Sequence, residues 1–252
     1  MRPIERWGLI LSALLLIATT VGLYGQDSDQ SPTAEAAPIT IHSVFAERVP
    51  VVTRPSIVLQ THLYLSIIDR EYRQPVFVAY HVSRSDFDTD NKLSRNFHTP
   101  PELRDVLLER GDLASSEYDI GHAYALASVS ARRFASEVNS FACLFVQEPD
   151  LNRGPWYDVE KRIRTFADDQ EVAVMAGQLF ECEMPRLPNA DEAHEVASHN
   201  WIWFRAGPLE EAYLFPQWEV ERQQPAADFE IEPAALFGRV ADRWYVFGAP
   251  SR

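Results

Sequence analysis

Apolar and polar side chains follow one another along this chain in a pattern typical of a sheet-rich domain. Residues 58–68 alternate and then become continuously apolar, and residues 75–82 form a second apolar run after the polar segment 69–74. We expect these two runs to be strands that pair as a hairpin. Four later segments share this apolar character and are also predicted strands: 141–146, 171–179, 199–204 and 212–215.

Helical spacing appears at two places between the predicted strands, in residues 128–138 and 154–168. The long stretch 83–118 is mostly polar and without a clear period. It is expected to be an ordered loop with one helix at 101–110. Strands and helices in this order predict an α+β fold, in which a central, mostly antiparallel sheet carries packed helices.

The first 25 residues resemble a targeting segment more than part of the domain. Arg2 and Arg6 precede an uncharged, largely apolar stretch that ends at Gly25. We therefore divide the chain into a signal peptide or membrane anchor at 1–25, a flexible linker at 26–38 and a folded domain at 39–252. The basic flank predicts an extracytoplasmic domain, membrane-anchored if the segment stays and periplasmic or secreted if it is cleaved.

Composition supports a packed core, because 46% of the 252 residues are hydrophobic and 14 Phe, 9 Tyr and 6 Trp are present. The net charge of −14 argues against a repressor or an architectural DNA-binding protein, since these need a basic face. It leaves room for a local basic cleft, for which the candidates are Arg95, Arg132, Arg133, Arg153, Lys161, Arg162 and Arg164. The two cysteines, Cys143 and Cys182, can form a disulfide or stay free.

Candidate chemistry is concentrated in two short motifs. The first is Tyr118-Asp119-Ile120-Gly121-His122, which ends in a side chain able to take a proton near neutral pH. The second, Leu151-Asn152-Arg153-Gly154-Pro155-Trp156, begins the predicted second helix, on which Glu160 and Arg164 share one face. Structural explanations exist for the same residues: Asn152 can cap a helix, and Glu160 and Arg164 can form a surface ion pair.

The motifs resemble the Asp-Arg-Gly-His and Asn-x-Gly-x-Trp signatures of the sugar-nonspecific DNA/RNA endonucleases of the ββα-metal type. This is the family of endonuclease G and of the secreted bacterial nucleases. The similarity extends from about Leu63 to Phe247, where residues 229–247 match a closing helix. It implies a ββα-metal nuclease core and the hydrolysis of DNA and RNA with Mg²⁺, or alternatively Mn²⁺. A homodimer is left open.

The resemblance also implies roles for individual residues. His122 corresponds to the general base, Asn152 to the metal ligand, and Glu160 to the residue that orients metal-bound water. Arg164 matches an arginine that contacts phosphate, twelve residues after the asparagine. Trp156 is expected to be a core residue.

Two further arginines match positions near the substrate in the family. Arg95, within Ser94-Arg95-Asn96-Phe97, corresponds to an arginine offered to the scissile phosphate. Arg153 corresponds to a residue of endonuclease G relatives and is a candidate phosphate contact.

One residue departs from the family pattern, because Ile120 stands where the family has an arginine. Three interpretations follow: a slower nuclease, a nuclease compensated by Arg95 or Arg132, or a membrane-tethered protein of weakened activity that serves in binding or assembly. A phosphodiesterase acting on a small nucleotide would use the same residues.

Overall fold

The computed structural model describes residues 50–52, 54–86, 93–129, 132–243 and 245–247. The predicted targeting segment and linker lie outside these residues. Within the described part, no helix is both long and apolar enough to span a membrane.

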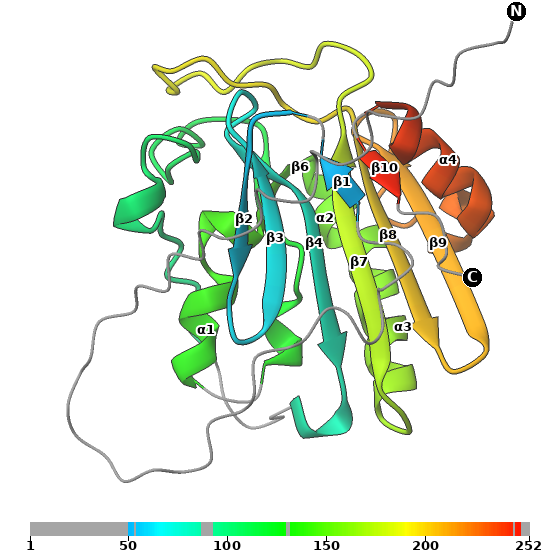
Figure 1. Ribbon diagram of the computed structural model, residues 1–252. Coiled ribbons are helices and arrows are strands. Elements are labelled where there is room, and N and C mark those ends of the chain that lie inside the picture. Colours follow the sequence, from blue (N-terminus) through cyan, green and yellow to red (C-terminus); the bar gives the residue numbers. More distant parts are fainter. Residues whose placement is uncertain (1–49, 53, 87–92, 130–131, 244, 248–252) are drawn as a thin grey trace, which may run out of the picture. The chain divides into compact units, whose positions relative to one another are not determined.

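A six-stranded antiparallel sheet lies at the centre of the domain (Figure 1). In spatial order its strands are β2 (Ser56–Gln60), β3 (Tyr64–Asp69), β4 (Gln74–Val82), β7 (Val172–Leu179), β8 (His199–Ala206) and β9 (Leu209–Pro216). Short turns join β2 to β3, β3 to β4 and β8 to β9, a longer segment (180–198) joins β7 to β8, and about ninety residues of chain separate β4 from β7. That long connection contributes the candidate catalytic residues, and the predicted α+β class is confirmed.

Helices cover both faces of the sheet. Side chains of α3 (Pro155–Ala167) share a hydrophobic cluster with Val174 of β7, and α4 (Pro233–Arg243) shares another cluster with Met175, the next residue. Successive side chains of a strand point to opposite faces. The apolar run of β7 is therefore explained by burial on both sides, and every one of its residues is buried.

The connection between β4 and β7 consists of short elements. They are the 3-10 helices η2 (Arg84–Asp86), η3 (Pro101–Leu103), η4 (Leu126–Ser128) and η5 (Phe141–Cys143), the strands β5 (Asp119–His122) and β6 (Leu144–Gln147), and the helices α1 (Arg132–Val138), α2 (Pro149–Arg153) and α3. Strands β5 and β6 pair antiparallel, and α2 and α3 follow β6, which gives a ββα arrangement. Elsewhere β1 (Pro50–Val52) pairs with β10 (Tyr245–Phe247), and η6 (Ala226–Phe229) precedes α4.

The segment between η3 and β5 is held firmly although it has little regular structure. Its leucines and Val106 pack in a third hydrophobic cluster with residues of β3 and β6. The Arg73 guanidinium donates hydrogen bonds to the carbonyl oxygens of Asp105, Arg104 and Leu107, at 2.8, 2.9 and 3.2 Å. These bonds satisfy backbone acceptors that regular structure would otherwise satisfy.

Several predicted elements were wrong in extent. The expected strand at 58–68 is two strands, because the Thr61 hydroxyl accepts hydrogen bonds from the backbone N–H groups of Leu63 and Tyr64 and forms a turn. The expected helix at 101–110 is only the 3-10 turn η3. The helix at 128–138 begins at Arg132, and the strand at 141–146 starts as the 3-10 turn η5. The closing helix, α4, lies within the expected tail.

The two cysteines are both free. Cys143 is buried and Cys182 is exposed. Burial raises the pKa of the Cys143 thiol well above its usual value, so this cysteine behaves as a small apolar core residue.

Candidate active site

Strand β5 carries the first motif and places His122 at its end. His122 lies opposite Leu144 and Gly121 opposite Phe145 in the register with β6. A Cβ atom at Gly121 would come within 1.7 Å of the Gln147 side chain, so a larger residue here would require the buried Gln147 side chain to move. The indole N–H of Trp156 donates to the His122 carbonyl oxygen at 3.3 Å. The predicted core position of Trp156 is confirmed, since the residue is 1% exposed.

The second motif forms a tight junction between two helices. Pro149 and Pro155 stand at the first positions of α2 and α3, where their missing N–H groups are not needed. A Cβ atom at Gly154 would lie 2.4 Å from the Arg222 carbonyl oxygen, so the junction requires glycine. Asn152 therefore lies on the short helix and Glu160 on the long one.

The capping explanation for Asn152 is wrong. Glu148 caps α2, because its carboxylate accepts a hydrogen bond from the Leu151 backbone N–H at 2.8 Å. The residue before α3 is Gly154, which offers no side-chain cap. The Asn152 amide instead donates to the Asp119 carboxylate at 3.0 Å.

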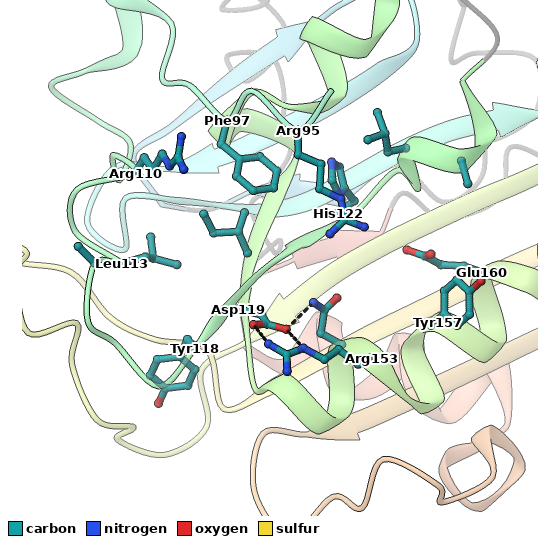
Figure 2. A pocket seen from close by; sticks show the side chains of 15 residues that line it. Arg95, Phe97, Arg110, Leu113, Tyr118, Asp119, His122, Arg153, Tyr157 and Glu160 are labelled. Atoms are coloured by element: carbon teal, nitrogen blue, oxygen red, sulfur yellow. Dashed lines mark hydrogen bonds and ion pairs between the residues drawn. The ribbon is translucent and has the colours of Figure 1, made fainter. Parts of the chain in front are cut away.

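These segments surround a pocket of about 650 Å³ (Figure 2). Its lining includes five of the six predicted site residues: Arg95, His122, Asn152, Arg153 and Glu160. The sixth, Arg164, is not part of the lining and reaches the pocket through Glu160, from which its Nη1 lies 3.9 Å.

His122 is buried and held by one partner. Its Nε2 lies 3.0 Å from Oδ1 of Asn139, and the Asn139 amide nitrogen donates to the Ser94 carbonyl oxygen at 2.7 Å. Because that second bond fixes the amide orientation, Oδ1 accepts and Nε2 carries the proton. Nδ1 keeps its lone pair. Burial lowers the pKa of His122 to about 4, with the charge of Arg95 adding to the effect and the Asn139 bond opposing it. The ring is therefore neutral at pH 7.

Asn139 was missed by the sequence reasoning. It lies in the turn after α1 and is 2% exposed. An asparagine at the end of a helix is common, and nothing in its sequence neighbourhood indicates a contact with His122, 17 residues away. Only the folded structure, which places the turn after α1 beside His122, shows it.

Glu160 lies where a carboxylate is poorly solvated. Burial raises its pKa to about 7, against the opposing effects of Arg164, the Trp156 indole N–H and Arg95. Nη1 of Arg164 is buried and makes no hydrogen bond within the described structure. The carboxylate and this guanidinium nitrogen are thus incompletely compensated by protein groups. Such a site favours further polar or charged ligands.

Asp119 organises the second motif. Its carboxylate accepts two hydrogen bonds from Arg153, at 2.8 and 2.7 Å, and a third from the Asn152 amide nitrogen. With the nitrogen of Asn152 engaged, its Oδ1 is the atom left to bind another ligand. Arg153 is exposed and can contact phosphate only while sharing its charge with Asp119.

The donor set restricts which metal could bind. No cluster of three or more His, Cys, Asp or Glu suited to metal binding occurs among the described residues. A single amide oxygen near a carboxylate suits a hard cation that keeps most of its waters, which is the behaviour of Mg²⁺. Glu160, whose carboxylate is poorly solvated, also suits Mg²⁺, because this ion prefers oxygen ligands and would balance the negative charge. Thiolate- or imidazole-rich sites for zinc have no counterpart there.

The other cations proposed for a basic cleft have different positions. Lys161 pairs with Asp158 and Arg162 with Glu211, and neither lines the pocket. The side chains of Arg132 and Arg133 lie outside the described part. Arg110, which the sequence reasoning did not select, does line the pocket.

A family model described as DNA/RNA non-specific endonuclease matches residues 44–233, most of the chain. The chain belongs to this family. The chain is similar in sequence to the Nuclease of Serratia marcescens, to which it is 32% identical over 154 residues. That match covers 56% of this chain and 57% of the Serratia protein, so the chain spans little more than half of that relative.

Structural comparison supports the nuclease fold independently. The solved EndoG/EndoGI complex contains a chain that superposes with a TM-score of 0.70 at 18% identity, covering 86% of this chain and 95% of that one. At this identity the likeness shows the fold alone.

Proposed function

We propose that this chain is a metal-dependent, nonspecific endonuclease that hydrolyses the phosphodiester bonds of DNA and RNA. The observation that carries the proposal is the pocket itself. It brings a neutral histidine, an amide oxygen, a partly buried carboxylate and an arginine together from four separate segments of a fold shared with this family. Each group answers a separate need of phosphodiester hydrolysis.

His122 supplies the base in this proposal. Its Nδ1 accepts a proton from the attacking water, while Asn139 holds the proton on Nε2 and so fixes which nitrogen reacts. The imidazolium that forms is destabilised by burial and by Arg95. It therefore returns its proton readily. The low pKa also means that the base is available throughout the neutral range.

Asn152 would hold the metal and Glu160 would orient the waters that the metal keeps, with Mg²⁺ the ion that best suits them and Mn²⁺ the alternative. The bound cation would stabilise negative charge on the phosphate and on the leaving 3′-oxygen. Asp119 orients Asn152 for this role, and Arg164 keeps Glu160 from being an isolated buried charge.

Arg95 and Arg164 would neutralise the phosphate, with Arg153 as a further contact. Ile120 lines the pocket without a charge, which favours a nuclease of reduced turnover and keeps a binding or assembly role as the second candidate.

The N-terminus, where Arg2 and Arg6 precede an apolar stretch, supports an extracytoplasmic protein, attached to the membrane if the segment is retained. Homodimer formation is a further proposal, which light scattering of the purified chain would test.

Digestion of supercoiled plasmid and of RNA by the purified protein tests the proposal. We expect nicking, then linearisation, in Mg²⁺ or Mn²⁺, and arrest by EDTA. Folded protein that leaves both polymers intact in either metal would overturn the enzyme assignment. Retained binding of DNA would then support the second candidate.

A further inference from the structure

The pocket has two chemically different ends, and the proposed mechanism uses only one of them. Glu160 and Tyr157 lie on one side of His122 and Asp119, while Leu113 and Tyr118 lie on the other (Figure 2). At the end away from Glu160 the labelled residues Phe97, Leu113 and Tyr118 are apolar or aromatic, and Arg110 lies beside them. Ile120 packs against the same hydrophobic cluster as these three and also lines the pocket, as does Ala114, the residue after Leu113. We call this end of the pocket the apolar end. A phosphodiesterase needs charge at the phosphate, so this surface serves another part of the substrate.

The apolar end begins beside the proposed base. The ring centroids of Phe97 and His122 lie 5.6 Å apart, so a group resting on Phe97 is next to the atoms that would react. A nucleobase is the part of a polynucleotide with apolar faces, and such faces stack on aromatic rings. Ile120 contributes to the same wall, where an arginine would bring charge.

The wall is built to keep its shape. The Tyr118 hydroxyl donates to the Pro185 carbonyl oxygen at 3.2 Å, and the Thr99 hydroxyl donates to the Leu108 carbonyl oxygen at 2.7 Å. Leu113 belongs to the buried cluster beneath the loop. A preorganised wall binds a base without first losing its own conformational entropy.

Two arginines lie along the pocket, Arg110 near Leu113 and Arg95 beside His122 (Figure 2). Arg110 and Arg95 line the pocket and are exposed, and no ion pair holds either of them in the described structure. Arg153, in contrast, is paired with Asp119. The two unpaired arginines are suited to the phosphates on either side of a base that enters the apolar end.

From these features we propose that the apolar end is a base-binding subsite, and that the enzyme acts preferentially on single-stranded or unpaired nucleic acid. The proposal rests on the nuclease function given above. A base within a duplex has both faces stacked and its edge paired, so it must leave the helix to reach Phe97 and Tyr118. That departure costs a few kcal/mol, which an unpaired strand avoids.

The experiment compares a mixed-sequence oligonucleotide, single-stranded or annealed to its complement, as substrate of the full-length protein in Mg²⁺. We expect kcat/KM for the single strand to exceed that for the duplex by on the order of tenfold or more. Tyr118→Leu should lower the single-strand value by about tenfold and leave the duplex value nearly unchanged, because stacking is lost only where it occurs. Tyr118→Phe restores the ring and should restore the preference.

Trp218→Leu is the matched control, because it removes a half-exposed aromatic side chain that does not line the pocket. Binding of the same oligonucleotides in EDTA, followed by fluorescence anisotropy, provides a readout without turnover. Equal kcat/KM for both substrates, or an equal loss on both in Tyr118→Leu, would overturn the subsite while the cleavage itself upholds the nuclease. If single strands bind the wild type more tightly than Tyr118→Leu but neither protein cleaves them, the subsite is supported and the nuclease function is contradicted. If the protein neither binds single strands through Tyr118 nor cleaves them, the subsite and the nuclease function are both refuted.

Discussion

Replacing Asn139 with aspartate should move the pH dependence of the enzyme without removing its proposed base. In the wild-type protein a neutral amide oxygen lies 3.0 Å from Nε2 of His122, and the pKa of His122 is about 4. A carboxylate at the same place favours the imidazolium. An opposite charge at this range raises a pKa by roughly 1–3 units. The pKa of His122 in Asn139→Asp is then expected between about 5 and 7.

The sign of the effect follows from which form reacts. The base is the neutral ring, so kcat/KM falls when pH drops below the pKa of His122. We expect the acid limb of Asn139→Asp to lie at higher pH than that of the wild type. At pH 6 a pKa of about 7 would leave roughly a tenth of the rings neutral, a loss of about tenfold. Folding is linked to the same proton: because the pKa of His122 is lowered in the folded state, we expect the stability to be highest above pH 6.5 and to fall as pH drops from there through about 4.

The assay is kcat/KM for a single-stranded oligonucleotide across the pH range at saturating Mg²⁺. Asn139→Ala is the control, because it removes the same hydrogen bond without adding a charge. Its acid limb should not move upwards, although unfolding should become easier by about 1–3 kcal/mol. Coincident acid limbs for Asn139→Asp and wild type, in folded proteins, would show that His122 does not set the pH dependence.

Three other predictions concern the metal, the missing arginine and the location. Asn152→Ala should raise the Mg²⁺ concentration needed for half-maximal rate at least tenfold, because even residues that only support a metal ligand change metal affinity by about 10–100-fold when mutated. An unchanged Mg²⁺ titration would show that Asn152 is not a ligand. Ile120→Arg should raise kcat/KM on duplex DNA by roughly tenfold, because a guanidinium stabilises charge developing on the phosphate. No gain in that rate would mean that Arg95 or Arg110 already fills the role. In cells with a permeabilised outer layer, added protease should digest the domain while a cytoplasmic marker survives, and protection of both would contradict the extracytoplasmic location.

Local sequence signals were sufficient where burial is periodic or complete. The β7 run and the α3 helix were predicted nearly to their ends, because each has one pattern that a single environment explains. The turn at Thr61 was missed, since threonine and leucine also suit a strand and only a side-chain bond to the backbone distinguishes the two.

The residues of the candidate site also fall into those that local sequence predicts and those that only the fold shows. His122, Asn152 and Glu160 were found because close motifs carry them, and the pocket brings them together. Asn139 and Arg110 were not found, because Asn139 contacts His122 from the turn after α1 and Arg110 lines the pocket from a loop without a period. Their contribution depends on tertiary contacts between distant segments, which no local pattern encodes. The unequal status of the arginines, with Arg153 paired and Arg95 and Arg110 unpaired, is likewise a property of the fold.

The central claim is that His122 is the general base of a metal-dependent nuclease. The measurement that tests it most directly is the single-turnover cleavage rate of His122→Ala beside the wild type, at saturating Mg²⁺ and with folding checked by thermal melting. We expect a loss of about 10²–10⁴-fold in rate, with oligonucleotide binding in EDTA nearly unchanged. Equal cleavage rates for the two folded proteins would contradict it.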